Sequence, residues 1–176
     1  YGRGGYILKC DVKKFFYNIS HDQLKDIVGY YFSDPDVLKL CELFIDSTEG
    51  KGLPLGNQIN QGFALLYLDG MDKLIKYDLG IEYYGRYMDD FYLIHHDKNY
   101  LKHCLKVITK HLKALDLTLN GKTQIFSFKN GVSYLGFHTY ITSDGKAIRK
   151  LKNQNKRNAQ KKFIRMAKLV AAGKLP

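Results

Sequence analysis

The residues of this sequence best suited to chemistry are three aspartates at the ends of predicted strands. Asp89 and Asp90 follow Tyr87 and Met88 between two hydrophobic and aromatic runs, so we expect both at the tip of a β-hairpin. Adjacent carboxylates repel each other unless a cation or a base offsets them. The ordinary explanation for such a pair is an acidic turn, because Asp is favoured in turns. That explanation weakens here because Asp11 ends another strand of the same predicted sheet.

Carboxylates that converge from strand ends favour metal-assisted transfer at phosphorus. Three of them can hold two divalent cations about 4 Å apart, where one cation activates the attacking hydroxyl and the other neutralises the leaving pyrophosphate. Mg²⁺ prefers oxygen ligands and keeps water and substrate phosphates in its shell, so few protein ligands suffice. The adjacent His95 and His96 show no zinc spacing and, on a strand, would point to opposite faces. We therefore predict two Mg²⁺ ions, with Mn²⁺ as a substitute.

Two kinds of hydrophobic period predict the elements that must position these aspartates. Residues 6–12 alternate as a half-buried strand, and residues 81–88 and 91–96 are predicted as the strands on either side of the aspartate pair. Apolar residues recur at helical spacing over 58–77 and again over 99–115, where lysines lie opposite the apolar stripe. We predict an α/β (α+β) fold in which an antiparallel sheet is backed by these two helices.

Cap and turn residues mark the remaining elements. They predict a helix from Ser20 (a capping box with Gln23) to about Phe32, a helix from Pro35 to about Ile45, a loop over 47–56, strands over 123–128 and 132–142 with hairpin signals at Asn130-Gly131 and Asp144-Gly145, and a basic helix over 153–172.

Composition excludes several classes of protein. With 45% hydrophobic and 26% charged residues, the 176-residue chain is globular, with room for one domain or one plus a fragment of a second. No apolar run nears the roughly 20 residues that span a bilayer. Cys10, Cys41 and Cys104 show no CxxC spacing and no disulfide framework, which favours a reducing, intracellular setting. The sequence begins at Tyr1 without a signal peptide, so we expect a piece of a longer protein.

Positive charge gathers at the end of the chain. The net charge is +11, and the residues after 145 hold 11 basic side chains and no acidic one. A basic tail on a neutral body indicates a polyanionic partner, nucleic acid by default. A solvated, charged helix face explains the same charge equally well. In the predicted helix, the residues expected on phosphates are Lys156, Lys161, Lys162, Arg165 and Lys168, and those expected to face the protein are Phe163, Ala167, Val170 and Ala171.

Five motifs occur in a fixed order along the chain. They are ILKCDVKKFFYNISHDQL (7–24), GLPLGNQINQGFALLYL (52–68), YMDD (87–90), LTLNGKT (117–123) and YLGF (134–137). In this order they resemble the palm region of reverse transcriptases, bacterial retroelement types in particular. YMDD alone would be weak, whereas five ordered motifs over about 130 residues are specific. The resemblance implies the palm of a right-hand polymerase that extends a DNA primer on an RNA template with dNTPs.

The resemblance also implies a role for each catalytic position. Asp11 and Asp89 would be metal ligands together with the backbone carbonyl of Val12, and Asp90 would be a further ligand or would stand behind the ligands. Lys122 falls where the family carries a lysine that protonates the leaving pyrophosphate. An ordinary turn lysine is the alternative at that position.

Other motifs would contact the nucleotide and the primer. Phe16 falls at the steric gate, where a bulky ring under the sugar excludes a ribose 2′-hydroxyl. A core aromatic is the alternative, because Phe15 precedes it and one of the two must pack inward. The remaining positions implied are Leu55, Gly56 and Gln61 for nucleotide binding and Tyr134, Leu135, Gly136 and Phe137 for the primer grip.

The second motif departs from the common family pattern. Many relatives have Gln at the position of Leu55, whereas diversity-generating retroelement enzymes have an aliphatic residue there and a Gln at the position of Gln61. Those enzymes usually have Ser in place of Asn60, and group II intron enzymes more often have Ala in place of Met88. Leu55 cannot make the hydrogen bond of that Gln to the nucleotide, which predicts reduced fidelity. The subtype stays open among diversity-generating, group II intron and retron-like enzymes.

The resemblance finally implies domain limits. Residues 1–145 would form the palm with the palm-proximal part of the fingers (17–50), and residues 146–176 would begin a basic thumb helix. We expect the N-terminal fingers and most of the thumb outside this sequence, no activity from the fragment alone, and a cytoplasmic bacterial source. Two alternatives stay open: an RNA-dependent RNA polymerase, against which Phe16 argues, and a nucleic-acid-binding or splicing-cofactor module without polymerase activity. The residues indicate no accessory protein or oligomeric state.

Overall fold

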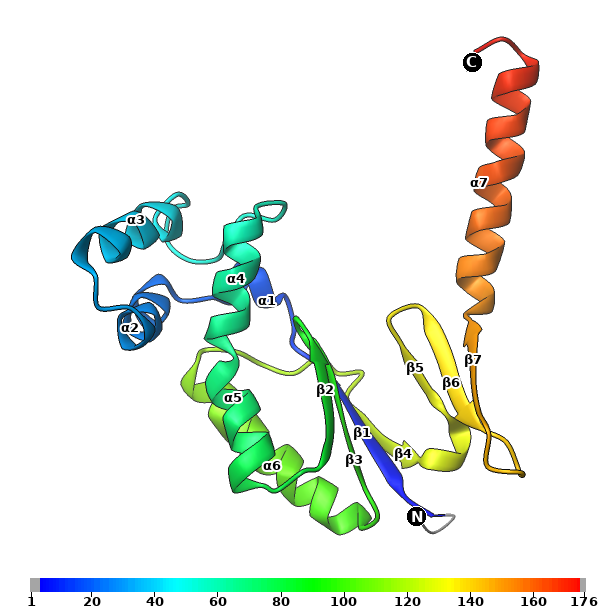
Figure 1. The fold of residues 1–176 in the computed structure, drawn as a ribbon, viewed down its shortest axis with the longest axis horizontal. Coiled ribbons are helices and arrows are strands. Elements are labelled where there is room, and N and C mark those ends of the chain that lie inside the picture. The colour runs from blue at the N-terminus through cyan, green and yellow to red at the C-terminus, as the bar shows by residue number, and fades with distance from the viewer. Residues whose placement is uncertain (1–3, 175–176) are drawn as a thin grey trace. The chain divides into compact units, whose positions relative to one another are not determined.

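The computed structural model describes residues 4–174, and the chain divides into two compact units, residues 1–126 and residues 127–176 (Figure 1). One four-stranded sheet and one three-stranded sheet organise them. Over residues 4–174, no helix is long and apolar enough to cross a membrane. The three cysteines are free thiols. The predicted limits of palm, fingers and thumb stay predictions.

The four-stranded sheet carries the predicted aspartates. Its strands are β1 (Tyr6–Asp11), β2 (Tyr83–Tyr87), β3 (Asp90–His95) and β4 (Gln124–Ser127), in the order β2-β3-β1-β4. Strand β3 pairs antiparallel with both β1 and β2. Leu8, Cys10 and Val12 are buried in the main core, as the alternation in β1 predicts. Ile7 is buried as well, although it belongs to the other side of the strand and lies outside that core.

Helices of the first unit follow their sequence signals closely. They are α1 (Phe15–Asn18), α2 (His21–Tyr31), α3 (Pro35–Ile45), α4 (Gln58–Tyr67), α5 (Asp69–Lys73), a π-helix (Leu74–Asp78) and α6 (Lys98–Ala114). Ser20, Asp34, Asn57 and Asp97 each cap a helix by accepting a hydrogen bond from a backbone N–H of its first turn.

Helix α6 covers one face of the sheet, where Figure 1 shows it beside the strands. Its buried residues Leu101, Cys104, Ile108 and Leu112 recur at the predicted helical spacing. They join Leu8, Phe91 and the helices α2, α4 and α5 in one hydrophobic core. The predicted antiparallel sheet backed by helices is therefore confirmed.

Three local predictions are wrong in this unit. The helix predicted over 58–77 is interrupted at Leu68, which has φ −102° and ψ 5°, and it ends as a π-helix. Ser20 caps α2 as predicted, but its own N–H donates to the hydroxyl of Tyr67 rather than to Gln23. Strand β3 ends at His95, so the strand alternation stops there and the rings of His95 and His96 lie 4.2 Å apart.

The second unit is a small sheet followed by one long helix. Its elements are a 3-10 turn (Phe128–Asn130), β5 (Val132–Tyr134), β6 (Phe137–Ile141), β7 (Ala147–Leu151) and α7 (Asn153–Ala171). Antiparallel pairing runs β5-β6-β7. The hairpin at Asp144-Gly145 is confirmed, because Ile141 pairs with Ala147.

Two predictions fail in the second unit. Asn130-Gly131 does not turn a hairpin, because β4 belongs to the first sheet and β5 to the second. The apolar side of α7 was predicted to face the protein. No residue of α7 is buried, and Phe163 is 69% exposed. Hydrophobic spacing shows that a helix has an apolar side, but it does not show that anything covers that side.

Candidate active site

The pairing of β1 with β3 brings two of the three aspartates side by side. Asp11, the last residue of β1, lies directly opposite Asp90, the first residue of β3. Residues directly opposite in antiparallel strands project to the same face. Lys9 lies on that face two residues before Asp11, and its Nζ forms an ion pair with Asp90 Oδ2 at 3.3 Å. Sequence reasoning missed Lys9, although its place in the alternation of β1 was a usable signal.

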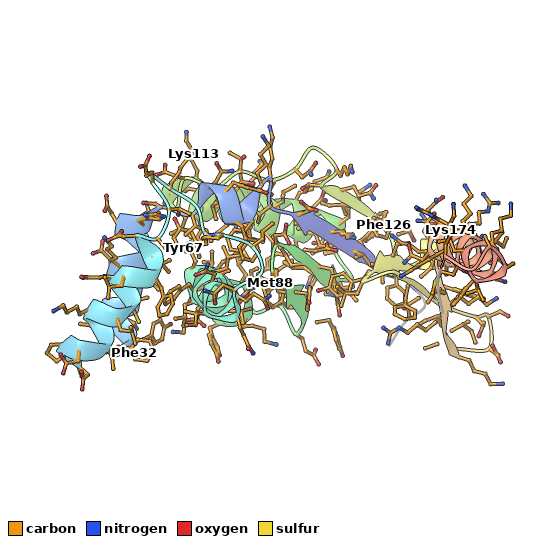
Figure 2. All side chains as sticks on the ribbon, turned by 90° about the horizontal axis from the view of Figure 1, so that it is seen from above. Phe32, Tyr67, Met88, Lys113, Phe126 and Lys174 are labelled. Atoms are coloured by element: carbon orange, nitrogen blue, oxygen red, sulfur yellow. The ribbon has the colours of Figure 1, made fainter. Side chains whose placement is uncertain are left out.

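The turn between β2 and β3 holds the third aspartate beside the end of β1. Tyr87 pairs with Asp90, so Met88 and Asp89 form a two-residue turn. Met88, labelled in Figure 2, has a left-handed φ of 54° at the position where such turns favour glycine. The backbone N–H of Val12 donates to the carbonyl of Asp89 at 3.0 Å. This bond ties the hairpin tip to the residue after Asp11, so the three aspartates lie at one end of the sheet.

Like charges set the electrostatics of this end of the sheet. Burial, followed by the charges of Asp11 and Asp90, raises the pKa of Asp89 above its ordinary value. Lys9 offsets part of the charge of Asp90. Burial also raises the pKa of the neighbouring Cys10 thiol to about 12, so this thiol stays protonated and is not a nucleophile.

The donors at this end of the sheet fit a hard divalent cation. Carboxylate and carbonyl oxygens are the ligands that Mg²⁺ prefers, and a cation would relieve the repulsion that raises the pKa of Asp89. Within the described residues, no three His, Cys, Asp or Glu side chains are gathered closely enough to hold a metal ion. The arrangement therefore suits a cation bound by one or two carboxylates and completed by substrate phosphates, as is common for Mg²⁺.

The segment 117–123 packs alongside the residues that follow β1. Lys13 N–H donates to the carbonyl of Thr118 at 2.8 Å, and Asn120 N–H donates to the carbonyl of Asp11 at 2.7 Å. The Nδ2 of Asn120 lies 3.5 Å from Asp11 Oδ1, and its Oδ1 accepts the backbone N–H of Lys122 at 3.2 Å. Asn120 thus holds both Asp11 and the turn of Lys122, which is exposed. Sequence reasoning missed Asn120, because side-chain bonds between distant segments leave no periodic signal.

The predicted nucleotide-binding residues come from two segments that meet through backbone bonds. Phe15 is buried, whereas Phe16 is half-buried with its ring edge-on to Phe15. Leu53 N–H donates to the carbonyl of Phe16 at 2.8 Å. Gly52 packs 3.0 Å from that carbonyl with a φ of 92°, which only glycine adopts easily. The inward ring is therefore Phe15, which leaves Phe16 available for the role of a gate.

The rest of the second motif offers exposed groups. Leu55 is 62% exposed, Gly56 has a φ of 97° with open space around it, and Gln61 is exposed on the first turn of α4. Asn60 is buried instead, and its Nδ2 donates to the carbonyl of Pro54 at 3.0 Å. Asn60 therefore holds the loop before α4 in place, so its departure from Ser has a structural explanation.

The predicted primer grip is a tight turn in the second unit. Tyr134 pairs with Phe137, and the two residues between them, Leu135 and Gly136, have φ values of 46° and 81°. The carbonyl of Gly136 accepts the N–H of Lys152 at 3.0 Å, which ties this turn to the residue before α7. The predicted phosphate-contacting residues of α7, which are Lys156, Lys161, Lys162, Arg165 and Lys168, are all exposed.

Comparison with known proteins identifies the class of this chain. The family described as "Reverse transcriptase (RNA-dependent DNA polymerase)" matches residues 2–139. Because this match covers most of the sequence, the chain belongs to the reverse transcriptase family. No curated protein sequence gives a significant match.

Solved telomerase structures share the fold. Apo telomerase from Candida tropicalis, truncated from its C-terminal domain, is 19% identical with a TM-score of 0.66 over 84% of this chain and 36% of that chain. Telomerase from Candida albicans in complex with a TWJ fragment of telomeric RNA is 16% identical with a TM-score of 0.66 over 83% and 30%. The corresponding complex from Candida tropicalis is 16% identical with a TM-score of 0.63 over 77% and 28%. At these identities the likeness concerns the fold, and the chain spans about a third of those telomerase chains.

Proposed function

We propose that this chain is the palm core of an RNA-directed DNA polymerase that adds dNTPs to a DNA primer on an RNA template. The observation that carries the proposal is the register of β1 against β3, which sets Asp11 opposite Asp90 beside the turn that contains Asp89. In a chain of the reverse transcriptase family, carboxylates gathered at one end of a sheet suit nucleotidyl transfer.

The residues at this end of the sheet would divide the work of the reaction. Asp11, Asp89 and the carbonyl of Val12 would hold two divalent cations, Mg²⁺ or the substitute Mn²⁺. Asp90, paired with Lys9, would stand behind them or complete the set. When bound, these ions lower the pKa of the attacking hydroxyl and offset the charge of the leaving pyrophosphate. Lys122, on the turn held by Asn120, would donate a proton to that pyrophosphate.

The substrates would be held by residues outside this cluster. Phe16 would exclude ribonucleotides, and Leu55, Gly56 and Gln61 would line the nucleotide site. The primer grip would be the turn from Tyr134 to Phe137, and α7 would follow the phosphates of the duplex. We further propose a bacterial retroelement source, and that residues 1–176 alone do not polymerise, because they span about a third of the solved telomerase chains.

Substitution of Asp89 tests the proposal in the complete protein that contains this chain. Asp89→Asn removes a metal ligand and its charge, so dNTP incorporation on a primed RNA should fall by at least about 10²–10³-fold. Asp78→Asn, an exposed aspartate outside the site, is the matched control and should retain wild-type incorporation. Unimpaired synthesis by Asp89→Asn would overturn the proposal.

Nucleotide preference separates the proposal from an RNA-dependent RNA polymerase. The wild-type protein should prefer dNTPs, and Phe16→Ala should admit rNTPs because it removes the ring under the sugar. A wild-type preference for rNTPs would favour the RNA polymerase and would contradict the role of Phe16. A protein that binds an RNA–DNA hybrid but incorporates neither nucleotide would instead be a binding module.

A further inference from the structure

Arg86 connects the turn that holds Asp89 to two helices. Its Nε donates to Asp72 Oδ1 at 2.7 Å, and its Nη2 donates to Asp72 Oδ2, so the guanidinium grips this carboxylate of α5 with two bonds. Its Nη1 donates to the carbonyl of Met88 at 3.1 Å, and Nη2 also reaches the carbonyl of Leu65 on α4 at 3.4 Å. One side chain therefore contacts β2, the catalytic turn, α4 and α5.

The surroundings fix this side chain in a single arrangement. Arg86 is 8% exposed in its side chain, and the hydroxyl of Tyr84 donates to the same Asp72 Oδ1 at 2.5 Å. Burial disfavours the charged guanidinium, but the hydrogen bonds and charge of Asp72 more than compensate, so the pKa of Arg86 is raised. A buried charge held by a planar, two-bond pair is far more restricted than an exposed ion pair.

The turn that Arg86 contacts needs such a restraint. Met88 adopts a φ of 54°, a left-handed conformation that is unfavourable for a residue with a side chain. The next residue, Asp89, is half-buried among like charges that push its carboxylate away from Asp11 and Asp90. Strained residues of this kind persist where the surrounding structure holds them. The bond from Arg86 fixes the carbonyl of the peptide that joins Met88 to Asp89.

We propose that Arg86, held by Asp72, is a positioning residue that keeps the Met88–Asp89 peptide in the conformation in which Asp89 can bind a divalent cation. This inference rests on the proposed function for the identity of the bound cation's role, but the restraint itself concerns this chain alone. Arg86 also contacts α4, which begins directly after the predicted nucleotide-binding loop. The same side chain therefore links the nucleotide-binding element to the catalytic turn.

Three variants of the complete protein test this role. Arg86→Lys keeps a positive charge, but it loses the planar fork that contacts Asp72 and Met88 together. Asp72→Asn keeps a neutral acceptor but removes the charge that orients the guanidinium. Tyr84→Phe is the matched control, because it loses one hydrogen bond to Asp72 in the same buried network and leaves every bond of Arg86 in place.

Hydrogen exchange in metal-free buffer gives the readout that does not depend on activity. The amide of Val12 donates to the carbonyl of Asp89, so release of the turn should expose it. Arg86→Lys and Asp72→Asn should speed exchange in peptides covering residues 8–16 and 84–92 by about tenfold, whereas Tyr84→Phe should not. Mn²⁺ titrations should show a half-saturating concentration for DNA synthesis raised by about 10–100-fold in the first two variants. The double variant should add little to either.

The contrary outcomes are distinct. Wild-type exchange at the turn with an unchanged Mn²⁺ requirement in Arg86→Lys would overturn the positioning role. Equal effects from Tyr84→Phe would also overturn it, since they would show general loosening of a buried network. If Asp89→Asn still synthesises DNA, the proposed polymerase function fails, while the exchange result for Arg86 still decides whether it restrains the turn.

Discussion

The two units of this protein divide packing and charge between them. All the buried hydrophobic residues belong to the first unit, the last of them being Leu117, whereas no residue of α7 is buried. The 12 basic residues and one acidic residue of the second unit account for the whole net charge of +11, and the first unit holds 16 of each sign. Figure 2 shows the same contrast, with side chains crowded between the helices and sheet of the first unit and basic side chains projecting from α7.

This contrast matches what the two proposed tasks require. Carboxylates that must hold cations need a rigid sheet and a packed core behind them. Contacts with phosphates are independent of sequence and geometry, so exposed lysines and arginines on a solvated helix suffice. The first unit therefore suits catalysis, and the second suits electrostatic binding.

Core truncations should separate the units most strongly. Phe91→Ala removes a fully buried ring from β3 and should lower the free energy of unfolding by about 3–5 kcal/mol. Phe163→Ala removes an exposed ring from α7 and should change it by less than about 0.5 kcal/mol. Chemical denaturation of both variants measures the difference. A large loss from Phe163→Ala would mean that α7 is covered in solution.

Salt titration should assign the binding of nucleic acid to the second unit. If α7 neutralises about four phosphates, the log–log slope of affinity against salt should lie near −3 to −4 for an RNA–DNA hybrid. Replacing Lys161, Lys162, Arg165 and Lys168 with Gln should bring that slope close to zero. The matched control replaces four exposed lysines of α6 in the neutral unit, Lys102, Lys106, Lys110 and Lys113. Equal slopes for the two variants would leave α7 as a solubilising surface.

The smallest effect should come from the charge repulsion inside the first unit. The pKa of Asp89 is raised by burial and by Asp11 and Asp90, so the folded state holds this proton more tightly than the unfolded chain does. The group therefore favours folding at low pH, and that contribution is lost as the pH rises through the raised pKa. In metal-free buffer, Asp89→Asn should be slightly more stable than wild type at neutral pH. Thermal unfolding should show this advantage disappear below pH 3.8, the ordinary pKa, and a variant less stable at neutral pH would contradict it.

Sequence patterns predicted most elements because their causes are local. The alternation of 6–12, the cap residues Ser20 and Pro35, and the apolar stripe of α6 each depend on neighbours a few residues apart, and each is found where it was expected. Where a distant contact decides, the patterns fail. The hydroxyl of Tyr67 replaces Gln23 at the start of α2, and the separation of β4 from β5 removes the hairpin at Asn130-Gly131.

The candidate site divides in the same way. The order and type of the motif residues indicated which carboxylates matter and which family the chain belongs to, because those features are written in the chain itself. The tertiary structure alone showed the ion pair of Lys9, the bonds of Asn120 and the contact of Arg86 with the Met88 carbonyl. These contacts join segments or backbone groups whose proximity follows from strand register and packing. A side-chain pattern records what each residue can do, but the register decides which groups it meets.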